Sequence, residues 1–471
     1  MNSYKPPLLS LTIPIRRYAR KWWSVSLADG FAGLAQTSLA LALVALPFRY
    51  RWVLLQRPAP PVYADYTDFL LFPSDLFLIL ALLFWMIGHL LRPAPIQVVP
   101  ARLSLPLLLL TTAALISAAG SVDSPLSLYH AAHLLLLAGF YIYLLNQGKV
   151  AALILPIAAQ VVLQAIIGIA QVLKQSSLGL SRLGELQLHP GTPGVSIVWA
   201  EGTRFLRAYG LSDHPNILGG SLAFGLVLIL GYFGQATRLQ RAWLAGVFLL
   251  TSLGVVLTFS RSAWLAFAVG GLFCIFWNIA SGRRQEALIQ AKLVLGTGIL
   301  LLPLLWQVAP FLGVRLNLGN SFQTVPYEIQ SLGERSLLSE ATLRIFTQNP
   351  WDGVGLGALP TAMRQAYSQF PVYYQPAHFV LLDVAAEIGL VGAICYLALL
   401  LAPWLALWAG RKKLSGSPEL GTFSALLLAA TIIGLLDHYT WSLAPGRIWQ
   451  WLIWGMWAAA YNSTLRRKGY V

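Results

Sequence analysis

Two stretches decide how this chain folds: PWDGVGLG at residues 350–357 and AHFVLLDVAAEIGLVG at residues 377–392. The second stretch begins beside His378 and runs through Asp383 and Glu387 directly into an apolar segment. Ionisable groups at the border of a lipid bilayer are costly and usually face a cavity or a partner. We therefore interpret residues 311–392 as a long polar loop that ends at a membrane, and the rest of the chain as the frame that holds this loop.

The composition of the 471-residue chain indicates a polytopic membrane protein. Hydrophobic residues make up 57% of the sequence and charged residues 10%, whereas soluble proteins carry about 25% charged residues. Apolar runs recur whose length matches the roughly 20 residues that a helix needs to cross a bilayer. The sequence lacks the alternating segments of about ten residues that are typical of a membrane β-barrel. The expected fold class is therefore all-α, with about 12 transmembrane helices.

Twelve apolar runs are candidate membrane spans. With an even number of spans, both termini lie on one side, and that side holds 19 of the 32 basic residues but three of the 17 acidic ones. An excess of Lys and Arg marks cytoplasmic loops, so the net charge of +15 follows from the topology, and we expect no nucleic-acid partner. The candidate spans are residues 30–48, 70–91, 103–119, 126–145, 150–173, 214–233, 242–259, 262–280, 293–310, 379–409, 421–438 and 447–461.

These spans divide the chain into five parts. The large loop is expected to contain helical segments at residues 334–347 and 361–368, broken by the Pro- and Gly-rich turn at residues 350–357. The N-terminal segment lacks a small-residue cleavage site, so we expect no removable signal peptide. The parts are a cytoplasmic N-terminal segment (1–29), helices 1–9 (30–310), a large extracytoplasmic loop (311–377), helices 10–12 (378–461) and a cytoplasmic tail (462–471).

Cysteine and histidine usage gives no indication of a metal centre. Cys274 and Cys395 lie in apolar runs, so we expect neither a disulfide nor a Cys-based metal site. His130 and His133 are spaced like a metal-binding pair, but no third ligand is near them in the sequence. No Asp-x-Asp motif is present, which disfavours sugar transfer from a metal-bound nucleotide.

The first candidate site residue is Arg207, which precedes the sequence SDHPN at residues 212–216. Ser212 or Asp213 is expected to cap the following helix, with Pro215 in its first turn. Arg207 would then lie beside a helix N-terminus, where anions bind. The alternative is that Arg207 pairs with Asp213 or with lipid headgroups.

The second candidate is Arg261, in the sequence TFSRSAW at residues 258–264, which is the whole connection between two predicted spans. Arg261 would lie at or just below the membrane surface, either reaching the headgroups or forming an anion site with Ser260 and Ser262. Of the 13 basic residues assigned to the outside, 12 are arginine and only Lys174 is lysine. Arginine binds phosphate through a rigid fork, although an ordinary surface preference would give the same skew in a small sample.

The third candidate is His378, at the point where the large loop enters a span. A neutral imidazole can take a proton from a hydroxyl near neutral pH; the alternative is a capping or headgroup-bonded histidine. Asp383 and Glu387 lie roughly 140° and 180° around a helix from His378, so the three side chains cannot share one face. Because residues 388–410 are uncharged and long enough to span with tilt, residues 378–387 are expected to extend the helix at the outer membrane edge.

These features together resemble the O-antigen ligase and polymerase-like superfamily of bacterial envelope glycosyltransferases, over residues 30 to 461. Two positions depart from the family pattern: Phe379 stands where Asn is frequent, and Asp383 where Gln is common. The resemblance rests on four segments: Arg207-x-x-Gly210 leading into His214-Pro215-Asn216-x-Leu218-Gly219; Ser260-Arg261-Ser262-Ala263-Trp264; Asn349-Pro350-x-x-Gly353-Val354-Gly355-x-Gly357; and His378 with Glu387-x-Gly389-x-x-Gly392.

The resemblance implies a membrane-embedded glycosyltransferase of the type C (GT-C) class that needs no cofactor and no metal. Such an enzyme transfers a glycan from an undecaprenyl-diphosphate carrier to a hydroxyl of a lipid, glycan or protein acceptor. The reaction takes place at the outer face of the cytoplasmic (inner) membrane and serves the biosynthesis of lipopolysaccharide or another cell-envelope polysaccharide. Alternatives are a repeat-unit polymerase of the same superfamily, a protein O-oligosaccharyltransferase, and a transporter of lipid-linked glycans that performs no chemistry.

The resemblance also assigns roles to residues. The catalytic residues would be Arg207, Arg261 and His378, of which the two arginines bind the donor diphosphate. Arg204 would assist them in binding the diphosphate. The supporting residues would be Asp383, Glu387, His214 and Asn216.

Overall fold

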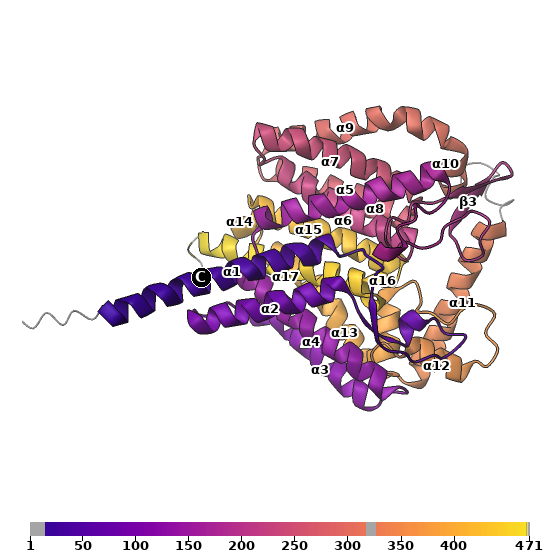
Figure 1. Cartoon of the computed structure of the whole chain (residues 1–471), viewed down its shortest axis with the longest axis horizontal. Coiled ribbons are helices and arrows are strands. Elements are labelled where there is room, and N and C mark those ends of the chain that lie inside the picture. Colours follow the sequence, from indigo (N-terminus) through magenta and orange to yellow (C-terminus); the bar gives the residue numbers. More distant parts are fainter. Residues whose placement is uncertain (1–14, 317–325, 468, 470–471) are drawn as a thin grey trace, which may run out of the picture.

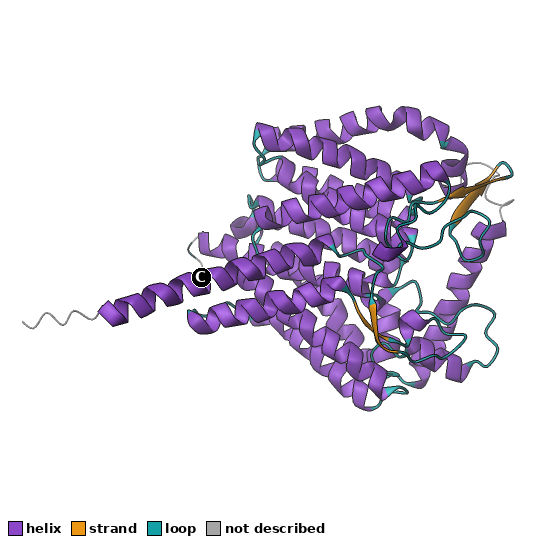
Figure 2. Ribbon diagram, in the orientation of Figure 1, coloured by secondary structure: helices purple, strands orange, loops and turns teal. Residues whose placement is uncertain are grey.

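The computed structural model describes residues 15–316, 326–467 and 469, and most of these residues are helical (Figure 1). The long helices lie side by side in one bundle. Figure 2 shows that the two small β-ribbons and many of the loops gather at the end of the bundle away from the C-terminus. The segments that the sequence assigns to the outside therefore meet at one end of the molecule.

Long helices occur at all twelve predicted spans. Ten of them, within the described part of the chain, hold a stretch long and apolar enough to cross a membrane, and α3 has a shorter apolar stretch, Leu103–Ala119. The protein is thus an all-α, multi-pass membrane protein, while the count of twelve spans stays a prediction. The helices are α1 (Ile15–Val44), α2 (Pro73–Leu91), α3 (Ala101–Ala119), α4 (Ser124–Gln147), α5 (Val150–Lys174), α6 (Pro215–Phe233), α7 (Arg238–Leu257), α8 (Arg261–Ala280), α9 (Arg284–Gln307), α13 (Val380–Ala409), α15 (Pro418–Leu436) and α17 (Ala444–Arg467).

Shorter elements fill the connections. The helices α11 (Pro326–Gln348) and α12 (Leu359–Ala366) overlap the two helical segments predicted in the large loop. Residues 317–325 of that loop lie outside the described residues, and the division of the chain into five parts stays a prediction. The other elements are α10 (Ala309–Leu316), α14 (Arg411–Leu414), α16 (Tyr439–Ser442), the 3-10 turns η1 (Ala64–Tyr66) and η2 (Ser181–Leu183), and the antiparallel pairs β1 (Trp52–Leu55) with β2 (Phe69–Leu71) and β3 (Ile197–Ala200) with β4 (Thr203–Leu206).

Helix α6 lies at the centre of the bundle, and all of its residues except Tyr232 are buried. Glycines permit this close packing, as small residues commonly do between membrane helices. A Cβ atom at Gly219 would lie 2.9 Å from the hydroxyl of Thr258, and one at Gly220 would overlap the hydroxyl of Tyr439. The first turn of α6 is therefore held directly against the α7–α8 connection and against α16.

Helix α13 is broken at Gly389, where φ is 77° and ψ is −173°. Glycine adopts such a conformation without steric cost, and a Cβ atom here would collide with the backbone of Trp351. Residues 380–388 are thus a short helical segment ahead of the span, as expected of the predicted extension. The turn at residues 350–357 pairs with this break through hydrogen bonds from Leu390 N to Pro350 O (2.8 Å), Val354 N to Ala386 O (2.9 Å) and Gly355 N to Glu387 O (2.9 Å).

Candidate functional site

The loop between β4 and α6 carries Arg207, which is buried in spite of its charge, with 5% of its surface exposed. Two glutamines of α5 hold this loop. The side-chain oxygen of Gln171 accepts a hydrogen bond from the backbone N–H of Gly210 (2.8 Å), and that of Gln164 accepts one from Leu211 (2.8 Å). Because these buried amides satisfy the loop backbone, Arg207 is fixed inside the protein.

The Arg207 guanidinium joins two of the predicted motifs. Its Nε donates to the carbonyl of Thr258 (2.7 Å), and its Nη2 donates to Oδ1 of Asn216 (2.7 Å). Thr258 belongs to the α7–α8 connection that leads to Arg261, and Asn216 lies in the first turn of α6. The rigid fork of arginine can bond two such partners at once. Three predicted site residues, Arg207, Asn216 and Arg261, are therefore gathered at one place.

The α7–α8 connection contains only three residues between the helix ends. Phe259 has a φ of 49°, and Ser260 caps α8 by accepting a hydrogen bond from Ala263 N (3.4 Å). Arg261 is half-buried at the first position of α8. Arg315 of α10 donates from Nε to the carbonyl of Phe259 (3.0 Å). A further arginine, which the sequence did not single out, thus lies at the same connection.

The predicted cap of α6 was wrong. His214, not Ser212 or Asp213, caps the helix: its Nδ1 accepts a hydrogen bond from Asn216 N (3.1 Å), and its Nε2 bonds to the hydroxyl of Ser196 (2.8 Å). Burial, reinforced by the charge of Arg207, lowers the pKa of His214 to about 3. A neutral imidazole is therefore available as the acceptor that a helix N-terminus requires.

Asp213 is unavailable as a cap because two arginines engage it. Arg49 and Arg51 lie 2.7 and 2.9 Å from its carboxylate, and Arg51 also pairs with Asp65. These ion pairs tie the segment before β1 to the start of α6. The alternative pairing of Arg207 with Asp213 is thereby replaced by the bonds of Arg207 to Thr258 and Asn216.

Arg204 lies apart from the other predicted donor-binding residues. It is exposed on β4, opposite Trp199 of β3, and its guanidinium lies 5.3 Å above the Trp199 ring. Within the described residues, no hydrogen bond joins Arg204 to Arg207 or Asn216. The structure thus brings Arg207 into the buried site and leaves Arg204 on a surface ribbon, and a donor-binding role for Arg204 stays a prediction.

Asn216 bonds to Arg207 on one side and to Asp437 on the other, and so connects Arg207 with the side chains around His378. Its Nδ2 donates to Oδ2 of Asp437 (2.9 Å), which lies between α15 and α16 and also accepts the backbone N–H of His438 (2.9 Å). The ligand atoms of His378, Asp437 and His438 all lie within 4.8 Å of one another, and the two imidazole rings cross at 82° with centroids 5.1 Å apart. We call these five residues, Arg207, Asn216, Asp437, His378 and His438, the Arg207–His378 network.

Burial sets the protonation of this network. It lowers the pKa of His378 to about 3, with the charges of His438 and Arg335 acting in the same direction and Asp437 opposing. Burial would raise the pKa of Asp437, but attraction to His378, His438 and Arg335 brings it to about 2. Near neutral pH, His378 is therefore neutral and Asp437 is a carboxylate. Nδ1 of His378 is buried and has no hydrogen-bond partner among the described residues.

Asp383 and Glu387 bond to different partners. Both are buried in α13. Asp383 accepts the backbone N–H of Ala377 (2.8 Å), immediately before His378, whereas Glu387 accepts the indole N–H of Trp441 in α16 (2.9 Å). Asp383 therefore fixes the backbone that carries His378, and Glu387 ties α13 to α16. Both arrangements suit the supporting roles expected of these residues, which stay predictions.

Sequence reasoning missed three residues of this site: Asp437, His438 and Arg335. Arg335, on α11, interacts electrostatically with His214, His378, Asp437 and His438. A signal for Asp437 and His438 was present, because a carboxylate and a histidine end an apolar run just as His378 begins one. Arg335 had no such signal, since it is one of several arginines in a polar loop.

The spacing of His378, Asp437 and His438 would also suit a metal ion, which the sequence did not suggest. The surrounding charge argues against that use. Asp437 already accepts hydrogen bonds from Asn216 and His438, and the positive charges of Arg207 and Arg335 lie near it. Cations repel a further cation, so this site is better suited to an anion and to proton transfer.

A second buried polar group, which we call the Arg447 cluster, comprises Arg447, His130, Glu387 and Trp441. Arg447 of α17 is 8% exposed, bonds through Nη1 to Nδ1 of His130 (3.0 Å), and donates from Nε to the carbonyl of Trp441. Glu387 accepts the Trp441 indole N–H and interacts electrostatically with Arg447. Arg447 and Glu387 are thus two buried side chains of opposite charge in one cluster.

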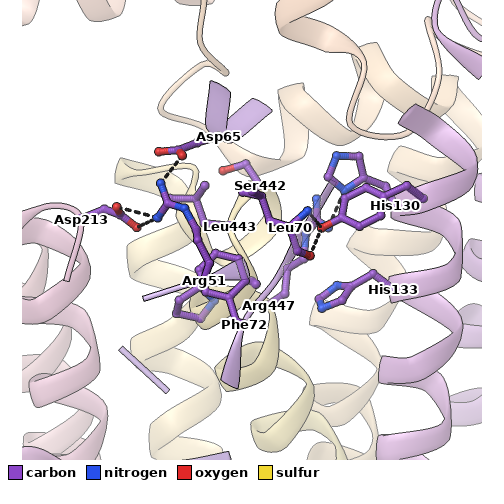
Figure 3. Close-up of a pocket in the computed structure, with 13 residues that line it drawn as sticks. Arg51, Asp65, Leu70, Phe72, His130, His133, Asp213, Ser442, Leu443 and Arg447 are labelled. Atoms are coloured by element: carbon purple, nitrogen blue, oxygen red, sulfur yellow. Dashed lines mark hydrogen bonds and ion pairs between the residues drawn. The ribbon is translucent and has the colours of Figure 1, made fainter. Parts of the chain in front are cut away.

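Figure 3 shows the small cavity, of about 30 Å³, that borders the Arg447 cluster. Arg447 and His130 line one side of it, and Arg51 lies on the other side between Asp65 and Asp213. A cavity of this size holds one or two water molecules, not a sugar. His130 and His133, considered as a metal pair, instead bond to different partners: His133 lies 2.9 Å from Asp75 of α2.

Comparison with known proteins bears on the resemblance seen in the sequence. A family described as O-antigen ligase matches residues 245–397, which include Arg261 and His378 but not Arg207, Asn216 or Asp437. No curated protein matches the chain. The match confirms the resemblance to the O-antigen ligase and polymerase-like superfamily, and it supports an enzyme in general.

Proposed function

Because residues 245–397 match the O-antigen ligase family, we propose that this multi-pass membrane protein is an O-antigen ligase-like glycosyltransferase. It transfers a glycan from an undecaprenyl-diphosphate carrier to an acceptor hydroxyl at the outer face of the cytoplasmic membrane. One observation carries the proposal: a continuous, buried set of contacts joins Arg207, beside the α7–α8 connection, to His378 at the start of α13.

The donor diphosphate binds at Arg207 and Arg261. Both lie where α6 and α8 begin, and the α7–α8 connection holds them together. Guanidinium groups bond phosphate oxygens in pairs, and helix N-termini add partial positive charge. Charge that develops on the departing diphosphate is stabilised here by groups that are already oriented, which is usually the largest contribution to catalysis.

An apolar cavity of about 280 Å³ supports a binding place for the lipid tail of the donor. It lies among α6, α7, α8 and α9 beside the α7–α8 connection, since Val255 and Val256 end α7 and Trp264 lies in the first turn of α8. An isoprenoid chain entering this cavity would leave its diphosphate at the level of Arg207 and Arg261. Further lining residues are Leu226, Phe248, Phe267, Val294, Leu301 and Leu305.

His378 acts on the acceptor. Its unpartnered Nδ1 accepts the proton of the acceptor hydroxyl as the oxygen attacks the anomeric carbon of the glycan. A new carbon–oxygen bond forms, the bond between the anomeric carbon and the diphosphate oxygen breaks, and the electron pair leaves with the diphosphate. Asp437 then faces a protonated imidazole and stabilises its charge.

A histidine with a pKa of about 3 is a weak base in the free protein. Donor binding changes this, because the negative charges of a diphosphate beside His378 favour its protonated form and raise its pKa. A pKa nearer the working pH makes a better general base. His378 would therefore become effective only after the donor has bound, which protects the reaction from premature proton transfer.

The direct test is turnover of radiolabelled lipid-linked glycan by the purified protein in detergent. Transfer to an acceptor supports the proposal, and movement of intact donor without transfer would indicate a transporter instead. In cells, His378→Ala should remove surface glycan and leave glycan on the carrier. Long chains on the carrier indicate a missing ligase, whereas single repeat units indicate a missing polymerase; unchanged surface glycan would make His378 a structural cap.

A further inference from the structure

Arg335 lies on the inward face of α11. Leu338 and Thr342, three and seven positions later, are fully buried on the same face. Helix α11 packs against α13, and His378 lies two residues before the start of α13. Arg335 is itself half-buried, one turn before the apolar contact begins. Its side chain therefore projects from the large loop towards the interior, not towards solvent.

Arg335 makes no hydrogen bond or ion pair with any residue that the structure describes. Two other arginines of the loops are compensated by acids: Arg344 of the same helix lies 2.6 Å from Glu340, and Arg51 pairs with Asp65 and Asp213. Removing a charge from water without a counter-ion is costly. A half-buried guanidinium left open in this way is therefore suited to an anionic ligand.

The electrostatic neighbours of Arg335 identify where that ligand would lie. They are His214, His378, Asp437 and His438, which surround Asn216 and Arg207. Asp437, the acidic member, is already bonded to Asn216 and to the backbone of His438. Arg335 thus faces the Arg207–His378 network from the large loop, whereas Arg207 belongs to the loop before α6 and Arg261 to the first turn of α8.

We propose that Arg335 is a third phosphate-binding arginine, which holds the diphosphate of the lipid-linked donor from the side of the large loop. This inference rests on the proposed function. Two arginines match the two negative charges of a diphosphate that is esterified at both ends. Breaking the bond to the sugar adds one more negative charge, and a third arginine supplies the matching cation where that charge develops.

The test uses the full-length protein in detergent at one salt concentration, with farnesyl diphosphate as a short probe of the lipid diphosphate. Arg335→Gln should weaken its binding by roughly tenfold or more, because hydrogen bonds to charged groups are the strong ones. Arg335→Lys keeps the positive charge but loses the planar guanidinium, so we expect a loss of affinity smaller than that of Arg335→Gln. Arg344→Gln is the matched control on the same helix, and it should bind the probe like the unmodified protein.

Two further probes separate the phosphate from the lipid. Farnesol lacks phosphate and should bind equally to the unmodified protein and to Arg335→Gln. Inorganic pyrophosphate should lose affinity for Arg335→Gln to a similar degree as farnesyl diphosphate, which would locate the effect at the phosphates.

The outcomes distinguish this inference from the proposed function. If the unmodified protein binds farnesyl diphosphate and Arg335→Gln binds it equally well, the role of Arg335 is overturned and the proposed function stands. If the unmodified protein binds farnesyl diphosphate no better than farnesol, both fail. If Arg335→Gln does not fold, the test is made with Arg335→Lys. Weaker binding of farnesyl diphosphate by Arg335→Lys supports the inference, and unchanged binding overturns it.

Discussion

The Arg207–His378 network and the Arg447 cluster are two buried polar groups in one helical bundle, yet they differ in what they leave open. In the Arg447 cluster, Arg447 bonds to His130 and to the Trp441 carbonyl, and Glu387 bonds to Trp441. In the Arg207–His378 network, Nδ1 of His378 is buried without a partner among the described residues. One group satisfies its members internally, and the other retains unused bonding capacity.

This difference teaches which buried charges indicate function. The arginines of the two groups are similarly buried, since Arg207 is 5% and Arg447 8% exposed. Removing one partner of a buried ion pair strongly destabilises a protein. A buried polar group without a partner has a different explanation, for example that it bonds to a ligand or takes part in catalysis. We therefore expect substitutions in the Arg207–His378 network to reduce turnover, and substitutions in the Arg447 cluster to reduce stability.

The largest expected effect is on turnover. His378→Ala should reduce the rate of glycan transfer by about 10²- to 10⁴-fold, because it removes the base that accepts the acceptor proton. The rate is measured with labelled lipid-linked glycan on protein of unchanged helix content. His189→Ala, at an exposed histidine of the loop before β3, is the control. Equal rates for both variants would remove His378 from the mechanism.

In the Arg447 cluster, Arg447→Met should cost about 3–5 kcal/mol of stability, because it leaves Glu387 buried without its partner charge. The thermal unfolding midpoint in detergent reports this loss. Adding Glu387→Gln should restore part of it, since the uncompensated charge disappears. A variant that unfolds normally but transfers no glycan would place Arg447 in the reaction and break the distinction between the two groups.

A smaller loss is expected for the donor arginines. Arg207→Lys and Arg261→Lys should each lower kcat/KM by roughly tenfold to a hundredfold, because lysine cannot bond two phosphate oxygens with a rigid fork. Arg204→Lys, at an exposed residue stacked on Trp199, should lose less. Near-normal kcat/KM in both of the first two variants would refute diphosphate binding by Arg207 and Arg261.

The smallest effect is a shift in pH dependence. The fall of kcat/KM at low pH reports the pKa of His378 in the free protein, which is about 3. The fall of kcat at low pH reports the pKa of His378 in the donor complex. As the pH falls, His378 becomes protonated at a lower pH in the free protein than in the complex with a bound diphosphate. The limb of kcat/KM should therefore lie at least about one pH unit below that of kcat. Coincident limbs near the pKa of an ordinary histidine would contradict donor-dependent basicity.

Sequence reasoning was successful where the signal is local. Apolar length located helices at all twelve predicted spans, and turn residues located the break between α11 and α12. Arg207, Arg261 and His378 were singled out because each lies next to the predicted start of a helix, and Asn216 because of the family resemblance. The prediction failed where several local candidates compete: Ser212, Asp213 and His214 can all cap a helix, and the arginines that engage Asp213 come from residues 49 and 51.

The sequence alone determined the helical class, the membrane-embedded character and the four motifs, because bilayer thickness and local backbone preference act on consecutive residues. Tertiary structure alone decided that Asn216 bonds to Asp437, 221 residues away, and that Arg335 faces inward from α11. Such contacts depend on which helices pack together, and packing is set by the shapes of side chains from the whole chain. The buried path from Arg207 to His378 therefore exists only once α6, α13 and α15 have met.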